Sequence, residues 1–103
     1  MQQATLDAIA SPRRREILRL VWDRELSAGE IAANFDVSWP AVSQNLNILR
    51  AAGLVSERRD GRRRLYRAEP KALGPLADAL REMWRADLRA LKAEVEVNRK
   101  RRR

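Results

Sequence analysis

Serine residues suited to cap a helix occur three times in the first half of the chain, each just before an apolar pattern of helical period. Ser11 precedes Pro12, and proline is tolerated at the first helical position. Ser27 stands three residues before Glu30, which is the spacing of a capping box. Ser38 precedes the third pattern. These signals predict three successive helices.

The apolar stripes give the extent of these helices. The first is expected over residues 12–24, the second is short, and the third runs over 38–52. Their buried faces are expected to carry Ile17, Leu18, Val21, Ile31, Phe35, Val42, Leu46 and Leu49. Gly53 ends the third helix in the left-handed conformation that glycine adopts at low cost. One or two further turns fit residues 2–10.

Beyond the third helix the pattern predicts a hairpin. Asp60-Gly61 favours a two-residue turn, because both residues can take positive φ, and residues 54–59 and 62–68 are then its strands. An isolated ribbon is marginally stable in water, so it needs to pack on the helices. Its apolar contacts are expected from Leu54, Val55, Leu65 and Tyr66.

The remaining segment is predicted to form one long helix over residues 75–98, and Gly74-Pro75 separates this helix from the residues before it. Apolar side chains recur there at intervals of three and four, at Leu76, Leu80, Met83, Trp84, Leu88, Leu91 and Val95. Residues 99–103 are all basic, and we expect them to be disordered. The sequence thus predicts one domain over residues 1–98, mainly α with a small β-hairpin, and a basic tail over 99–103.

The charge distribution indicates an anionic partner. The 103 residues carry 22 Lys and Arg against 14 Asp and Glu, a net charge of +8. Residues 58–67 hold six arginines against Asp60, residues 25–49 hold no basic residue, and residues 71–98 are balanced. The positive charge is therefore concentrated on the predicted hairpin and the tail.

Several classes of function are disfavoured. The chain has no Cys and no His, so disulfides, thiolate or imidazole metal sites and histidine bases lack their side chains. No nucleophile–base pair or phosphate-cradling glycine loop is visible, so we expect no enzyme and no cofactor. No apolar run approaches the length of a membrane span and residues 1–10 do not resemble a secretory signal, which predicts a cytoplasmic protein.

Two short helices joined by a tight turn and followed by a basic hairpin describe a winged helix-turn-helix. The major groove of B-form DNA is about 12 Å wide and admits one helix. The outward face of the third helix offers small or neutral polar groups that can contact base edges, and the hairpin offers guanidinium groups for phosphates. The candidate DNA-binding residues are Ser38, Trp39, Pro40, Ser43, Gln44, Asn47, Arg50, Arg58, Arg59, Arg62, Arg63 and Arg64.

Two other interpretations stay open beside sequence-specific binding. A polar helix face is often only solvated, and the winged helix can serve as a docking module for a protein, with the basic tail held by an acidic partner. The charge also fits a nonspecific nucleic-acid coat. Protection of one discrete palindromic sequence distinguishes the first function from both.

The chain resembles the ArsR family of bacterial repressors. The resemblance lies in residues 6–18 (LDAIASPRRREIL), 26–32 (LSAGEIA), 38–46 (SWPAVSQNL), 49–55 (LRAAGLV) and 61–67 (GRRRLYR). It implies a homodimer that binds a two-fold operator as a transcriptional repressor, with Trp39, Pro40, Ser43 and Gln44 facing the groove. Asn45 stands where many members carry His. Because the family's metal sensors use Cys or His, the chain resembles its metal-independent branch, and an inducer or anti-repressor remains open.

The length of the last helix indicates a dimer. At 1.5 Å per residue, residues 75–98 span about 36 Å, whereas a globule of this size has a radius of gyration of about 13 Å. The stripe can fold back on its own core, but pairing with a second chain is the favoured interpretation, and it places half-sites one DNA turn apart. The expected interface residues are Leu6, Ile9, Leu80, Met83, Trp84, Leu88, Leu91 and Val95.

Overall fold

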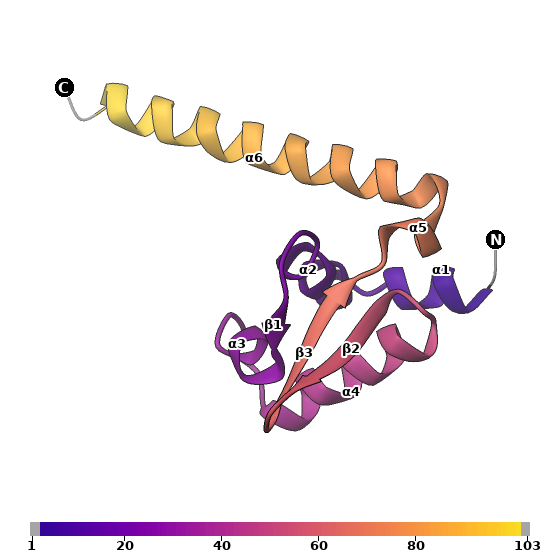
Figure 1. Cartoon of the computed structure of the whole chain (residues 1–103). Coiled ribbons are helices and arrows are strands. Elements are labelled where there is room, and N and C mark those ends of the chain that lie inside the picture. Colours follow the sequence, from indigo (N-terminus) through magenta and orange to yellow (C-terminus); the bar gives the residue numbers. More distant parts are fainter. Residues whose placement is uncertain (1–2, 102–103) are drawn as a thin grey trace. The chain divides into compact units, whose positions relative to one another are not determined.

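The computed structural model describes residues 3–101 and divides into two compact units, residues up to Leu73 and residues from Gly74 onward. The first unit contains α1 (Gln3–Ile9), α2 (Pro12–Leu20), β1 (Leu26–Ser27), α3 (Ala28–Ala32), α4 (Trp39–Ala51), β2 (Val55–Asp60), β3 (Arg63–Ala68) and α5 (Pro70–Leu73) (Figure 1). The second contains α6 (Pro75–Arg101). The expectation of one domain over residues 1–98 stays a prediction.

All three predicted helix starts are confirmed. The Ser11 hydroxyl accepts a hydrogen bond from the Arg14 N–H at 3.3 Å, at the head of α2. Ser27 and Glu30 form the full capping box of α3. The Ser38 hydroxyl accepts from the Ala41 N–H at 3.4 Å and so starts α4. Each serine satisfies a backbone donor that has no partner inside its helix.

The core of the first unit is made by the predicted apolar stripes. Its fully buried side chains include Ile17, Leu18, Val21, Ile31, Val42, Leu46, Leu49 and Leu54. Each buried leucine, isoleucine or valine contributes about 1.5–3 kcal/mol. Phe35 is only half-buried, so its assignment to the core was wrong. It lies beyond the end of α3, in the bend that leads to α4, where the helical spacing no longer applies.

Two arginines of α2 fasten α1 to it. Arg14 donates through Nε to the Ala8 carbonyl (2.6 Å) and through Nη2 to the Asp7 carbonyl (2.9 Å). Its third donor, Nη1, reaches Oδ1 of Asn45 on α4 at 3.1 Å. Arg15 donates to the Ile9 carbonyl at 2.7 Å. The last carbonyls of α1 are thereby satisfied, and one guanidinium joins three helices.

The sheet contains one more strand than the sequence predicted. Its order is β1-β3-β2, all antiparallel, with Leu26 opposite Tyr66. The hairpin turn also lies one residue later than expected. Asp60 pairs with Arg63 inside the ladder, so the turn is Gly61-Arg62. Gly61 has a φ of 64°, and a positive φ at the first central residue alone is the pattern of a type II′ turn.

The first predicted helix ends four residues early, at Leu20 rather than near Arg24. Tertiary hydrogen bonding explains the difference. The Val21 carbonyl accepts a hydrogen bond from the Ala68 N–H at 2.8 Å, and Val21 itself has left helical geometry. This contact fastens the end of β3 to the end of α2, and no local pattern could reveal it.

In the second unit, α6 continues to Arg101 and so includes residues 99–101 of the basic tail, while residues 102–103 lie outside the described residues. The expected disorder of the tail stays a prediction. Arg and Lys are good helix formers, and cations are favourable at a helix C-terminus. Among the predicted stripe residues, Leu80 and Trp84 are buried, whereas Met83, Leu88, Leu91 and Val95 are exposed. Over residues 3–101, no helix combines the length and apolar character of a membrane span.

The three-way contact of Arg14 gives a stability prediction. Replacing Arg14 by Ala leaves two helix-end carbonyls and the Asn45 amide oxygen without their charged donor, and we expect the free energy of unfolding to fall by about 1–3 kcal/mol. Arg13→Ala is the matched control, because Arg13 is exposed and no side-chain hydrogen bond or ion pair is found for it among residues 3–101. Urea denaturation of the three proteins measures the effect. Equal losses in both variants would contradict the role assigned to Arg14.

Candidate nucleic-acid interface

The outward face of α4 carries uncharged side chains. Trp39 is 53% exposed, Pro40, Gln44 and Asn47 are exposed, and Ser43 is half-buried. Pro40, Gln44 and Asn47 lie opposite the buried stripe because 3.6 residues make one helical turn, whereas Trp39 and Ser43 lie at the edge of the stripe. The helix therefore presents hydrogen-bonding groups and one indole to solvent, without a charge until its last turn.

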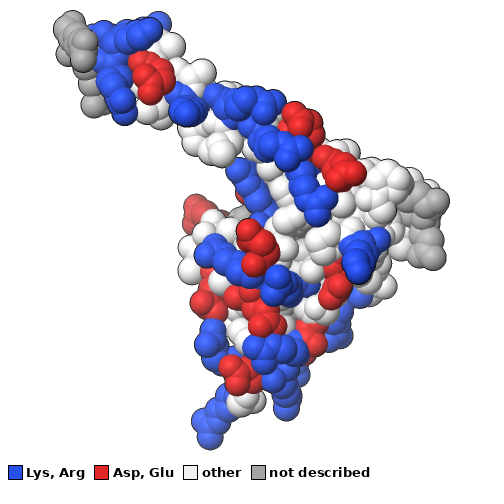
Figure 2. Space-filling view, turned by 45° about the horizontal axis from the view of Figure 1, so that its top comes forward, with Lys and Arg blue, Asp and Glu red and all other residues white. Residues whose placement is uncertain are grey.

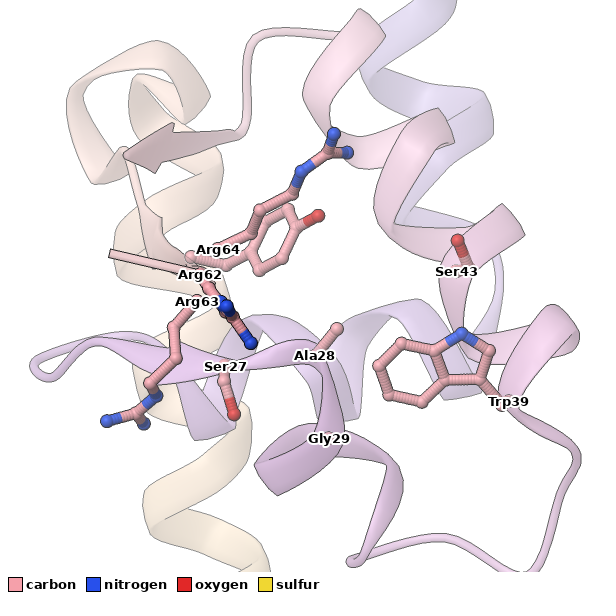
Figure 3. A pocket seen from close by; sticks show the side chains of 9 residues that line it. Ser27, Ala28, Gly29, Trp39, Ser43, Arg62, Arg63 and Arg64 are labelled. Carbon is pink, nitrogen blue, oxygen red and sulfur yellow. The ribbon is translucent and has the colours of Figure 1, made fainter. Parts of the chain in front are cut away.

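A hollow of about 400 Å³ separates the start of α4 from the hairpin. Figure 3 shows Trp39 and Ser43 on one side of the hollow, and on the other side Arg62, Arg63 and Arg64. The lining residues are Ser27, Ala28, Gly29, Trp39, Ser43, Arg62, Arg63, Arg64 and Tyr66. A methyl group added at Gly29 would lie 3.7 Å from Cζ3 of Trp39, so the indole lies beside the start of α3. Three separate segments of the sequence thus meet around one polar, cationic hollow.

The arginines of the hairpin, which we call the wing (residues 55–68), are not equivalent. Arg58 forms a two-pronged pair with Glu25, through Nε to Oε2 at 2.7 Å and Nη2 to Oε1 at 2.8 Å. Arg63 donates to Oε1 of Glu30 at 2.5 Å, the same oxygen that accepts the Ser27 N–H at 2.9 Å. The capping box of α3 therefore also holds a wing arginine.

A third carboxylate joins the wing to α4. Oε2 of Glu57 lies 2.5 Å from Nη1 of Arg50, in the last turn of α4, and its Oε1 lies 3.6 Å from Nε of Arg64 on β3. The Glu57 side chain is 17% exposed, whereas both arginines remain more than half exposed. The two cations can therefore still meet an incoming anion.

Arg59 and Arg62 differ from these arginines. Within the part of the chain that the structure describes, neither is found in an ion pair. Figure 2 accordingly shows acidic side chains interspersed with basic ones over the visible face rather than one uniformly positive area. The sequence located all of the wing cations but not their counter-charges, Glu25, Glu30 and Glu57. For Glu57 the sequence did hold a signal. Side chains alternate between the two faces of a strand, so Glu57 is expected on the same face as the wing arginine two residues later, Arg59.

Two carboxyl groups of this surface have perturbed acidity. The hydrogen bonds from Arg58 hold the pKa of the Glu25 carboxyl below its ordinary value, and attraction to Arg58 and Arg67 acts in the same direction. The pKa of Glu30 is lowered first by its hydrogen bond from the Ser27 backbone, and Arg63 adds to this. Both carboxylates thus stay charged in the folded protein at pH values where free glutamate begins to protonate.

Comparison with known proteins agrees with this arrangement. Residues 11–57 match the family described as bacterial regulatory protein, arsR family. The chain is 40% identical over 77 residues to the HTH-type transcriptional regulator Rv2034 of Mycobacterium tuberculosis. The matched residues make up 75% of this chain and 72% of that protein. The chain belongs to the ArsR family. The predicted winged helix-turn-helix fold is thereby confirmed, and this member is a DNA-binding transcriptional regulator.

Two further relatives differ in the direction of their regulation. The transcriptional repressor SdpR of Bacillus subtilis is 44% identical over 54 residues, which make up 52% of this chain and 60% of that protein. The structure of HlyU from Vibrio cholerae, named a transcriptional activator, superimposes with a TM-score of 0.70 at 32% identity, over 79% of this chain and 88% of that one. All of these relatives are named as regulators of transcription rather than enzymes.

Without Cys and His, only acidic side chains are left as possible metal ligands in this ArsR protein. Over residues 3–101, no three acidic side chains come together as a metal site requires. Glu82, one of the acids of α6, is paired with Arg85 at 3.0 Å and with Arg89 at 3.2 Å, and these hydrogen bonds lower the pKa of its carboxyl. The predicted independence of metal remains an expectation.

The Glu25–Arg58 pair gives a prediction about pH. Because the pKa of Glu25 is lowered in the folded protein, the pair stabilises the fold above the ordinary pKa of glutamate and loses this effect as the pH falls through the folded value. We expect wild type to exceed Glu25→Gln in free energy of unfolding at pH 7, and the difference to vanish in acid. Urea denaturation of both proteins across this pH range measures it. A difference that is constant across the range would contradict the pairing.

Proposed function

We propose that this ArsR-family protein is a repressor that binds palindromic operator DNA as a homodimer, with α4 in the major groove and the wing on the backbone. The carrying observation is the hollow of about 400 Å³ that brings the uncharged face of α4 and the wing arginines together. Uncharged hydrogen-bonding side chains can contact base edges, and guanidinium groups can contact phosphates. The two kinds of group lie on adjoining elements here.

Within this surface the candidate residues divide by chemistry. Gln44 and Asn47 can make paired hydrogen bonds to adenine, and Ser43 can reach several base edges. Arg59, Arg62 and Arg67 are the wing cations without an ion pair in the described part of the chain. Arg59 and Arg62 lie nearest the hairpin turn, so they are the first candidates for phosphate contacts. Ser38 acts chiefly through the cap of α4, since its hydroxyl already accepts the Ala41 N–H.

The proposed dimer uses the exposed part of the predicted stripe. Met83 is 39% exposed, and Leu88, Leu91 and Val95 are about half exposed, although all four are apolar. An exposed apolar row of this length on one helix indicates a protein contact. Leu6 is exposed and Ile9 half-buried, and both stay in the proposed interface, as do Leu80 and Trp84 of α6.

Binding selection from random duplex DNA, followed by footprinting, tests the proposed function. Enrichment of one palindromic sequence with half-sites about one DNA turn apart supports it. Equal binding of all duplexes at moderate salt would instead support a nonspecific coat. Absence of duplex binding would support a docking module for a protein.

Gln44 and Arg62 should separate specificity from affinity. Gln44→Ala should cost about 1–3 kcal/mol on the selected operator and little on random DNA, because it removes a base contact. Arg62→Ala should weaken both complexes alike and make the slope of log K against log salt shallower by about one per chain, because it removes a phosphate contact. Titrations of both duplexes at several salt concentrations measure this. Equal losses on both duplexes for Gln44→Ala would refute its assignment.

A charge placed in the proposed interface should separate the subunits. We expect Leu88→Glu to give a folded, helical monomer that binds the operator far more weakly, because each half-site then binds independently. Ala86→Glu is the matched control, since Ala86 is exposed on the same helix and lies on the opposite side from Leu88, Leu91 and Val95. Sedimentation and operator titration on one sample decide the matter. A Leu88→Glu protein that remains dimeric would locate the interface elsewhere.

A further inference from the structure

We propose that Glu57 is a specificity-determining residue of this regulator: it positions the wing against α4 and reduces attraction to DNA of arbitrary sequence. The proposal rests on the proposed function, because it concerns the same DNA-binding surface. It goes beyond that function by assigning a role to an acidic residue within a surface that must bind a polyanion.

The geometry makes Glu57 a bridge between the two DNA-binding elements. It lies on β2 opposite Tyr66, and its carboxylate directs Oε2 to Arg50 of α4 and Oε1 to Arg64 of β3. Arg64 also lines the hollow that faces Trp39 and Ser43. Arg50 follows Trp39 by eleven residues and Ser43 by seven, so all three lie on one side of α4. Glu57 thus connects the wing side of α4 to the wing itself.

The other two carboxylates that form ion pairs with wing arginines have narrower roles. Glu25 pairs with one wing arginine, Arg58. Glu30 pairs with Arg63 but also completes the capping box of α3, so its substitution would disturb a helix start. Only for Glu57 do the described residues show contacts to cations on both α4 and the wing. Substitutions of Glu57 can therefore test both the effect of its negative charge and its positioning of the wing against α4.

The charge of Glu57 should act mainly on nonspecific binding. Nonspecific affinity comes from cations that replace the counterions of phosphates, and a carboxylate between two such cations offsets part of this attraction. Positioning should act mainly on specific binding, because base contacts by α4 and phosphate contacts by the wing must occur together. Removing the charge of Glu57 and shortening its side chain should therefore affect DNA binding in different ways.

Two substitutions separate these effects. Glu57→Gln removes the charge, and we expect random-duplex affinity to rise about three- to ten-fold with a salt slope steeper by about one per chain. Operator affinity should rise less, so that the ratio of operator to random binding falls. Glu57→Asp keeps the charge but shortens the side chain by one methylene. Its random-duplex affinity should stay within about two-fold of wild type while operator affinity falls.

Glu69→Gln is the control for net charge, because Glu69 is exposed in the same unit and is not found in an ion pair among residues 3–101. Urea denaturation of each variant reports whether it folds normally. If Glu57→Gln weakens both complexes together, or matches Glu69→Gln, the inference is overturned. If wild type itself prefers no sequence, the proposed function fails, while the random-duplex affinity of Glu57→Gln still tests the charge effect.

Discussion

Val42, Leu46 and Leu49 bury one stripe of α4 in the core of the first unit, and the rest of the candidate surface depends on that burial. A helix has a fixed period, so burying this stripe also determines which side chains face outward. Gln44 and Asn47 are exposed as a result. A rotation of α4 about its axis would expose leucine and bury amides without partners, and both changes are costly.

Charge acts on this framework at a finer level. The wing carries six arginines, and three carboxylates from different elements each meet part of this charge. Exposed ion pairs contribute little to stability. Their larger effect is on orientation and on the number of cations that are free to meet phosphates. On the proposal made above, these acids adjust both the affinity and the selectivity of the surface for DNA.

The sequence predicted the parts of the structure that depend on local chemistry. The caps at Ser11, Ser27 and Ser38, the stripe of α4 and the left-handed Gly53 each follow from neighbouring residues, and the structure confirms them. Strand β1, which the sequence did not predict, and the early end of α2 depend instead on hydrogen bonds to β3. Those partners are 40 and 47 residues away in the chain, so no local pattern could report them.

The candidate site shows the same division. Cations and neutral polar groups could be located from composition and helical spacing, because each is a property of one segment. The pairing of Arg58 with Glu25 and of Arg63 with Glu30 joins residues 33 positions apart. Which arginines have a counter-charge therefore became visible only in the folded chain. The comparisons with known proteins establish the family, and the roles of individual residues follow from the structure as proposals.

The central claim is that DNA meets α4 and the wing rather than another basic segment of the chain. Backbone amide chemical shifts of this 11.9 kDa protein, recorded by NMR with and without a duplex of the selected sequence, test this claim most directly. The account predicts the largest changes in residues 38–50 and 58–64. Changes confined to residues 13–24 or 99–101, with α4 and the wing unaffected, would contradict it.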